Sequence, residues 1–143
     1  TLSDLRGKTV LLYFGYTTCP DVCPTTLSDL RQMMAALGED RAKVQVLFVT
    51  VDPPRDTVEH MAAYLTYFDP SFVGLTGTPE QIEALASKYG VIYTIREGSS
   101  AAGYFIDHTS AVLAIDPEGR LRLMFPYGVT GDQMAADVSL LMQ

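Results

Sequence analysis

Residues 10–38 read VLLYFGYTTCPDVCPTTLSDLRQMMAALG, and this segment predicts a strand, a loop with two cysteines and a helix in succession. Its first five residues, Val10–Phe14, are all apolar, which is typical of a strand buried on both faces of a parallel or mixed sheet. From Thr25 to Leu37 apolar residues recur at helical spacing, with one of the two initial threonines as the expected N-cap. The cysteines therefore fall where open α/β sheets bind ligands, between a strand end and a helix start.

The remaining chain alternates strand and helix patterns before it ends in a hairpin and a helix. Strands are predicted at 44–51, 72–75, 91–95, 111–115 and 121–125, and helices at 57–68, at 79–89 and from Thr130 or Asp132 onward. Parallel crossover units come first and an antiparallel hairpin comes last. We therefore expect an α/β protein with a thioredoxin-like fold, that is, a mixed sheet flanked by helices, with an insertion and a C-terminal hairpin.

Length and composition restrict the class of protein further. The 143 residues are 48% hydrophobic, which predicts one domain over 1–143 whose core needs no disulfide or metal for support. A net charge of −7 argues against a nucleic-acid-binding surface and against a polybasic membrane patch. We therefore expect no nucleic-acid partner.

Cys19 and Cys23 are the only cysteines in the chain, and three interpretations apply to them. They could be inert buried residues, but they flank proline and aspartate in a loop instead of lining an apolar face. They could form a redox dithiol, because the start of a helix lowers the pKa of a nearby thiol. Together with one imidazole they could also bind a thiophilic metal, and Cu(I) accepts such a set of three soft ligands more readily than structural zinc does. The spacing alone leaves the redox and metal interpretations open.

The chain has two histidines, and we expect His108 to be the one at the site. A lone histidine is usually bonded to a backbone group, but His108 follows a predicted strand and a loop long enough to reach the edge of the sheet. Asp107, its neighbour, could orient the imidazole by a hydrogen bond. His60 lies off the apolar stripe of its predicted helix, which indicates an ordinary surface position.

Two acidic positions near the cysteines have both a structural and a functional interpretation. The segment from Asp52 to Asp56, DPPRD, is either a turn with a helix cap and a surface ion pair, or a loop beside the cysteines. Asp21 lies between the two thiols, where its like charge would raise the pKa of each thiol. No pair of carboxylates suggests an acid/base site.

Three segments together resemble the motifs of a known family, the Sco/SenC proteins. They are Gly15–Thr25 (GYTTCPDVCPT), Val51–Thr57 (VDPPRDT) and Asp107–Ser110 (DHTS). Their order and separations agree with the family pattern, and the resemblance covers nearly the whole chain. It implies a thioredoxin-like fold that binds one copper ion, Cu(I) or Cu(II), through Cys19, Cys23 and His108. We expect Asp21, Asp52 and Asp107 to contact these ligands without binding the ion themselves.

The resemblance also implies partners and a cellular location. Family members are copper chaperones for the CuA centre of cytochrome c oxidase, so the expected partners are the CuA-bearing subunit and a second copper chaperone. They are usually tethered to the bacterial inner membrane, facing the periplasm, or to the mitochondrial inner membrane, facing the intermembrane space. The printed chain lacks such a tether, and either trimming or a soluble variant would explain this.

An enzymatic role remains open beside the metallochaperone role. Some relatives are described as thiol–disulfide reductants for the cysteines of the oxidase, which would make Cys19 the nucleophile and Cys23 the resolving thiol. Oxidation of the pair to a disulfide would also release copper, because a disulfide cannot hold the ion. Peroxide reduction is a weaker alternative, because no basic residue lies near the cysteines in the sequence to stabilise a thiolate.

Overall fold

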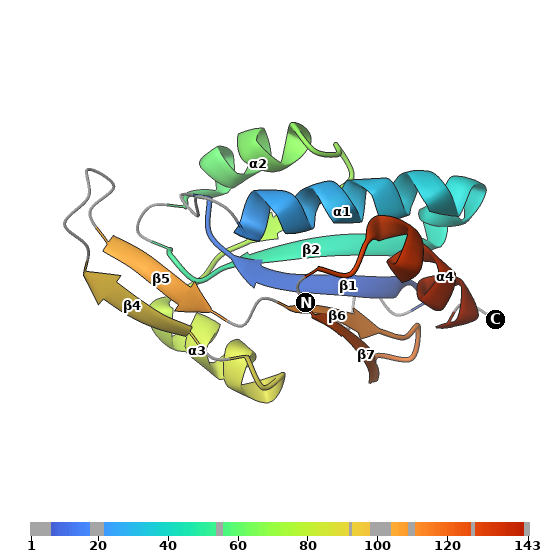
Figure 1. Ribbon diagram of the computed structural model, residues 1–143. Helices are drawn as coiled ribbons and strands as arrows, with labels where there is room; N and C mark the ends of the chain where they lie inside the picture. The colour runs from blue at the N-terminus through green and yellow to red at the C-terminus, as the bar shows by residue number, and fades with distance from the viewer. Residues whose placement is uncertain are drawn as a thin grey trace.

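The computed structural model describes residues 7–17, 22–53, 56–91, 93–97, 104–108, 111–126 and 128–141, and of these it describes only the backbone at 22–23, 93–97 and 104–108. A five-stranded mixed sheet forms the centre, in the order β3-β2-β1-β6-β7, and β4 and β5 form a separate two-stranded sheet (Figure 1). The strands are β1 (Thr9–Gly15), β2 (Val44–Thr50), β3 (Val73–Leu75), β4 (Tyr93–Glu97), β5 (Tyr104–His108), β6 (Ala111–Ile115) and β7 (Leu121–Pro126).

The central strand β1 pairs with β2 in parallel and with β6 in antiparallel orientation. All seven residues of β1 are buried, as the continuous apolar run predicted for a strand covered on both faces. Residues paired across strands point to the same face of a sheet. Tyr13 therefore shares a face with Phe48 and Val112, while Leu12 faces the other side with its own partners.

Helices cover both faces of this sheet. They are α1 (Val22–Leu37), followed by the 3-10 helix η2 (Gly38–Lys43), α2 (Val58–Thr66), α3 (Pro79–Lys88) and α4 (Gly131–Leu141). Figure 1 shows α1 and α2 above the sheet and α3 below it. Gly74 of β3 faces α2, because a Cβ built there would lie 3.0 Å from the Cβ of Met61. The core is therefore divided between two layers, one on each side of β1.

Local sequence signals locate three of the helix starts. Thr57 caps α2 by accepting a hydrogen bond from the amide of His60, and Thr78 and Gln81 form a reciprocal capping box at α3. Thr130 accepts a bond from the amide of Gln133 at the start of α4. These three caps agree with the sequence predictions.

The expected start of α1 was wrong. The helix begins at Val22, three residues before the predicted Thr25, so neither Thr25 nor Thr26 is its N-cap. Pro24 is consequently the third residue of the helix, where a missing amide hydrogen breaks no helical bond. The structure also contains β5, which pairs with β4 and adds one strand to the expected order.

Among the described residues, no helix combines the length and the apolar character needed to cross a bilayer.

Candidate metal centre

Several described segments that adjoin the predicted ligands lie at the carboxyl end of β1. β1 and β2 run parallel and end side by side, with Gly15 paired to Thr50. β6 runs the opposite way, so it begins at this same end, and its Val112 is paired with Tyr13. In Figure 1 the first turn of α1 and the β4–β5 ribbon also lie at this end, on the left of the molecule. This edge of the sheet therefore gathers parts of the chain that are far apart in sequence.

Cys23 is the second residue of α1. The first amides of a helix have no partner within the helix, so together with the helix dipole they favour a thiolate at this position. The earlier helix start therefore places Cys23 within the first turn, where the sequence had suggested a preceding loop. Cys19 and Asp21 lie outside the described residues, and the side chain of Cys23 is not described.

His108 is the last residue of β5, where it is paired with Tyr93. Only two residues separate it from Ala111, the first residue of β6, so their Cα atoms are at most about 11 Å apart. This short connection ties His108 to the edge at which β1 ends. Asp107 precedes it in β5, and the side chains of both residues lie outside the described part of the structure.

In the described part of the chain, no group of three or more histidine, cysteine, aspartate or glutamate residues is arranged to hold a metal ion. Because the side chains of Cys19, Cys23 and His108 are not described, their role as ligands stays a prediction. The chemistry of this donor set suits copper, since two thiolates and one imidazole are soft ligands that Cu(I) accepts in low coordination number.

A buried carboxylate next to this edge is the best-defined feature of the site region. Asp56 has no exposed surface. Its Oδ2 accepts hydrogen bonds from the Thr17 amide at 3.0 Å and from Thr50 Oγ1 at 2.7 Å, and its Oδ1 accepts one from Thr17 Oγ1 at 2.5 Å. These bonds connect the residues that follow β1 and end β2. Asp56 thus joins the two strand ends next to the cysteine segment.

Sequence reasoning offered Asp56 as a helix cap or turn residue, or as part of a loop beside the cysteines. The structure shows that Thr57 alone caps α2, which leaves the Asp56 carboxylate free for the strand ends. A signal for this was available, because Thr17 and Thr50 both follow apolar strand patterns and offer hydroxyl donors. What the sequence could not show is that a residue 39 positions away would receive the hydrogen bonds of Thr17.

His60 extends this arrangement to the surface. Its Nε2 lies 2.9 Å from Thr17 Oγ1, and the residue is exposed, as the sequence predicted. Because Thr17 Oγ1 gives its hydrogen to Asp56, it can only accept from His60, so Nε2 carries a hydrogen. A protonated Nε2 has no lone pair for a metal ion. In this tautomer Nδ1 keeps its lone pair, so the expectation that His60 is not the ligand stays a prediction.

Asp52 is buried at the end of β2, with 2% of its surface exposed. Its amide donates to Thr50 Oγ1 at 2.9 Å, and its carbonyl oxygen accepts from the Asp56 amide at 3.0 Å. The predicted position beside the cysteine segment therefore fits the described backbone, because Thr50 and Asp56 both contact Thr17 or its neighbours. Its action on a metal ligand stays a prediction.

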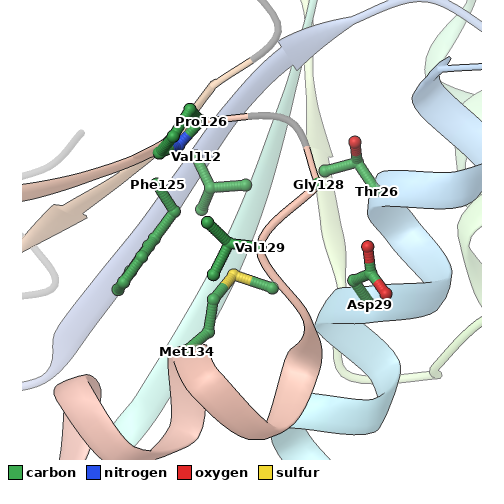
Figure 2. Close-up of a pocket in the computed structure, with 8 residues that line it drawn as sticks. All are labelled: Thr26, Asp29, Val112, Phe125, Pro126, Gly128, Val129 and Met134. Carbon is green, nitrogen blue, oxygen red and sulfur yellow. The ribbon is translucent and has the colours of Figure 1, made fainter.

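A small pocket lies between α1, β7 and α4, near the end of the sheet at which β1 ends. Figure 2 shows Thr26 and Asp29 of α1 opposite apolar side chains of β7 and α4, among them Phe125 and Met134. The pocket has room for about one water molecule. Burial raises the pKa of the Asp29 carboxyl, because the charged form loses hydration there. Sequence reasoning did not single out Asp29, which borders the apolar stripe of its helix.

A sequence model of the family described as SCO1/SenC matches residues 1–143, the whole chain. The chain belongs to the SCO1/SenC family. It is similar to the mitochondrial SCO2 homolog of Bos taurus, with 44% identity over 119 residues that cover 82% of this chain and 45% of the relative. The chain spans about half the length of the curated SCO2 relatives that it matches.

Solved Sco structures share the fold of this SCO1/SenC chain. ScoI of Bradyrhizobium japonicum, solved with copper bound, is 38% identical, with a TM-score of 0.88 over 97% of this chain and 88% of that one. Apo Sco1 of Thermus thermophilus is 40% identical, with a TM-score of 0.87 over 98% of this chain and 83% of that one. The predicted thioredoxin-like α/β fold with a mixed sheet is therefore confirmed.

Proposed function

We propose that this protein binds one copper ion through Cys19, Cys23 and His108 and delivers it to the CuA site of cytochrome c oxidase. One observation carries the proposal: Cys23 in the first turn of α1 and His108 at the end of β5 both lie at the carboxyl edge of β1. Thr17, which precedes Cys19 by two residues, lies at this edge as well, hydrogen-bonded to Asp56. Two thiolates and an imidazole meeting there would make a three-coordinate site for a soft ion.

The relatives support the choice of copper as cargo. The ScoI structures of Bradyrhizobium japonicum and Arabidopsis thaliana both have copper bound, and they are 38% and 33% identical to this chain. Delivery would require that the ion can leave as well as bind. A site open at the edge of a sheet meets this need, because a partner's thiols can approach the ion directly.

A second function rests on the position of Cys23. A thiolate favoured by the helix start suits a thiol–disulfide reductase that acts on the CuA-site cysteines. Cys19 would attack the partner's disulfide to form a mixed disulfide, and Cys23 would displace the partner's second thiol. Two electrons would thereby pass to the partner, and a Cys19–Cys23 disulfide would remain.

The proposed partners and compartment follow from the same reasoning. The recipient would be the CuA-bearing oxidase subunit, and a second copper chaperone would supply the ion. With a net charge of −7, the protein would dock more readily on a basic surface of either partner. We place the domain in the periplasm or the mitochondrial intermembrane space, held at the membrane by a segment outside this chain.

An anaerobic Cu(I) titration of the reduced protein against a competing chelator tests the proposal. We expect one equivalent to bind tightly in the wild type. His108→Ala should weaken binding by about 10-fold or more, because even groups outside the ligand set change metal affinity by that factor. Met124→Ala serves as the control for adventitious sulfur binding, because Met124 on β7 is 62% exposed and should not affect the titration.

Two results would contradict the proposal. Loose copper binding that does not depend on His108, together with a readily reduced Cys19–Cys23 disulfide, would make the protein a reductase first. Stoichiometric binding lost in the Met124 variant would show that copper sits elsewhere.

A further inference from the structure

Asp56 holds the main chain just ahead of Cys19. Of the three described hydrogen bonds that its carboxylate accepts, two come from Thr17, one from the amide and one from the hydroxyl group. A bond to an amide fixes the direction of the backbone, whereas a bond to a hydroxyl group alone would fix only a side chain. Only one residue separates Thr17 from Cys19. The direction in which the chain leaves Thr17 therefore limits where Cys19 can lie.

Hydrogen bonds to neighbouring residues fix the position of Asp56 itself. Its amide donates to the Asp52 carbonyl oxygen, its carboxylate accepts from Thr50, and the next residue, Thr57, caps α2. A buried carboxylate is costly unless its oxygens are hydrogen-bonded, and here both oxygens are. Through Asp56, Thr17 is thus attached to the end of β2 and to the start of α2.

We propose that Asp56 is the positioning residue of the cysteine segment 18–22, which holds Cys19 where it can act together with Cys23. This inference rests on the proposed function. Without Asp56 the segment would sample more conformations while the thiols are free. Binding copper, or closing a disulfide, would then have to order it, and both reactions would become less favourable.

The inference predicts the effect of Asp56→Ala on two separate equilibria. Cu(I) affinity, measured against a competing chelator, should fall by about 10-fold. In the metal-free protein, disulfide formation is measured against glutathione: the protein dithiol and glutathione disulfide give the protein disulfide and two glutathione molecules. Its equilibrium constant should also fall by about 10-fold, or about 30 mV for this two-electron couple.

Asp56→Asn separates position from charge. The amide oxygen can accept from the Thr17 amide and from Thr50, while the Nδ2 group donates to Thr17 Oγ1. Thr17 Oγ1 would then accept from Nδ2 and from His60 Nε2 through its two lone pairs. All the links survive although the charge is lost, so both equilibria should stay within about 2-fold of wild type. If charge were what matters, the asparagine variant would behave like the alanine variant.

The chain offers a matched control in Asp69. It is 6% exposed and also accepts three hydrogen bonds, from the Ser71 amide at 2.8 Å, Ser71 Oγ at 2.7 Å and Arg41 Nη2 at 2.6 Å. It lies toward the amino end of β2, away from the cysteines, because Ser71 contacts the side chain of Gln45. Asp69→Ala should destabilise the fold as Asp56→Ala does, yet leave both equilibria within about 2-fold of wild type.

The possible results distinguish a failure of the positioning role of Asp56 from a failure of the proposed function. If Asp56→Ala changes the two equilibria no more than Asp69→Ala does, the positioning role is overturned while tight copper binding by the wild type preserves the proposed function. If the wild type binds no copper but Asp56→Ala still shifts the glutathione equilibrium, the proposed function fails and the positioning role stands. Should Asp56→Ala not fold, Thr17→Val replaces it. This variant keeps the amide bond to Asp56 and loses the hydroxyl contacts with Asp56 and His60. It should weaken both equilibria about 3-fold, and no change would overturn the inference.

Discussion

Asp29 lies on α1 with its carboxylate drawn partly out of water, beside Val129 and Met134. Burial raises the pKa of this carboxyl above its usual value, so the charged form is less stable in the folded than in the unfolded protein. The difference between the folded-state and unfolded-state pKa determines how the stability changes with pH. A raised pKa costs stability above the folded-state pKa, and the cost disappears below the unfolded-state value of about 4.

Asp29→Asn is therefore expected to stabilise the protein at pH 7, by about 0.5 kcal/mol or less because the side chain is only partly buried. Urea unfolding at a series of pH values measures this. The difference from wild type should shrink to zero as the pH falls toward about 3, where the wild-type carboxyl is protonated in both states. The exposed Asp137→Asn is the control, and an equal gain from it would contradict the explanation by burial.

At the scale of elements, the contact between α1 and α4 depends on a glycine. Gly131, the first residue of α4, is buried against the backbone of α1. A Cβ there would collide with the carbonyl oxygen of Asp29 and would lie 2.6 Å from Gln32 Cβ and 2.7 Å from the Met33 amide nitrogen. The close approach also lets the Gly131 amide donate to Gln32 Oε1 at 3.2 Å.

Gly131→Ala should consequently destabilise the protein by about 1–3 kcal/mol, the usual cost of overpacking, because α4 must move away from α1. The direction of the change in stability tests this explanation, since a glycine-to-alanine change in a helix normally stabilises the helix. Chemical denaturation monitored by circular dichroism measures the change. A stabilised variant would mean that the two helices tolerate the extra methyl group.

The elements that local sequence signals determine were predicted best. Thr78, Pro79 and Gln81 form a cap within four residues, so the start of α3 could be read directly. The start of α1 was placed too late, although Pro24 is compatible with the first turn of a helix, which needs no amide hydrogen there.

Contacts between segments far apart in the sequence could not be predicted. The pairing of β4 with β5, and the hydrogen bonds from Thr17 and Thr50 to Asp56, depend on how distant segments fold together. At the site, the sequence supplied the candidate ligands and the edge at which they lie. It did not reveal the carboxylate that holds the chain next to them.

At the scale of the whole molecule, two buried carboxylates, Asp69 and Asp116, stabilise the fold through hydrogen bonds and ion pairs. A hydrogen bond from the Arg120 amide lowers the pKa of Asp116, although burial opposes it. The Glu118 amide, the charge of Arg120 and a hydrogen bond from the Arg122 side chain lower it further. At Asp69 burial tends to raise the pKa, but the hydrogen bonds from Ser71 and Arg41 outweigh it and the pKa is lowered.

A lowered pKa stabilises the protein above the unfolded-state value of about 4, and this contribution is lost as the pH falls through the folded-state pKa. We therefore expect the free energy of unfolding to decrease steadily from about pH 5 to about pH 2. The double variant Asp69→Asn/Asp116→Asn should be less stable than wild type at pH 7 and should show a flatter pH profile. Parallel profiles for the two proteins would rule out these carboxylates as the cause.

The antiparallel pairing of β6 with β1 has a consequence for the order of events during synthesis. His108 is made 85 positions after Cys23, and β6, the strand that follows it, can join β1 only after that. At about 5–20 residues per second, the two thiols wait about 4–17 seconds for the proposed third ligand. Nascent chains would thus carry an unpartnered dithiol through this interval. Copper supplied during this interval would meet an incomplete set of donors, so loading should come after His108 is made and β6 has joined β1.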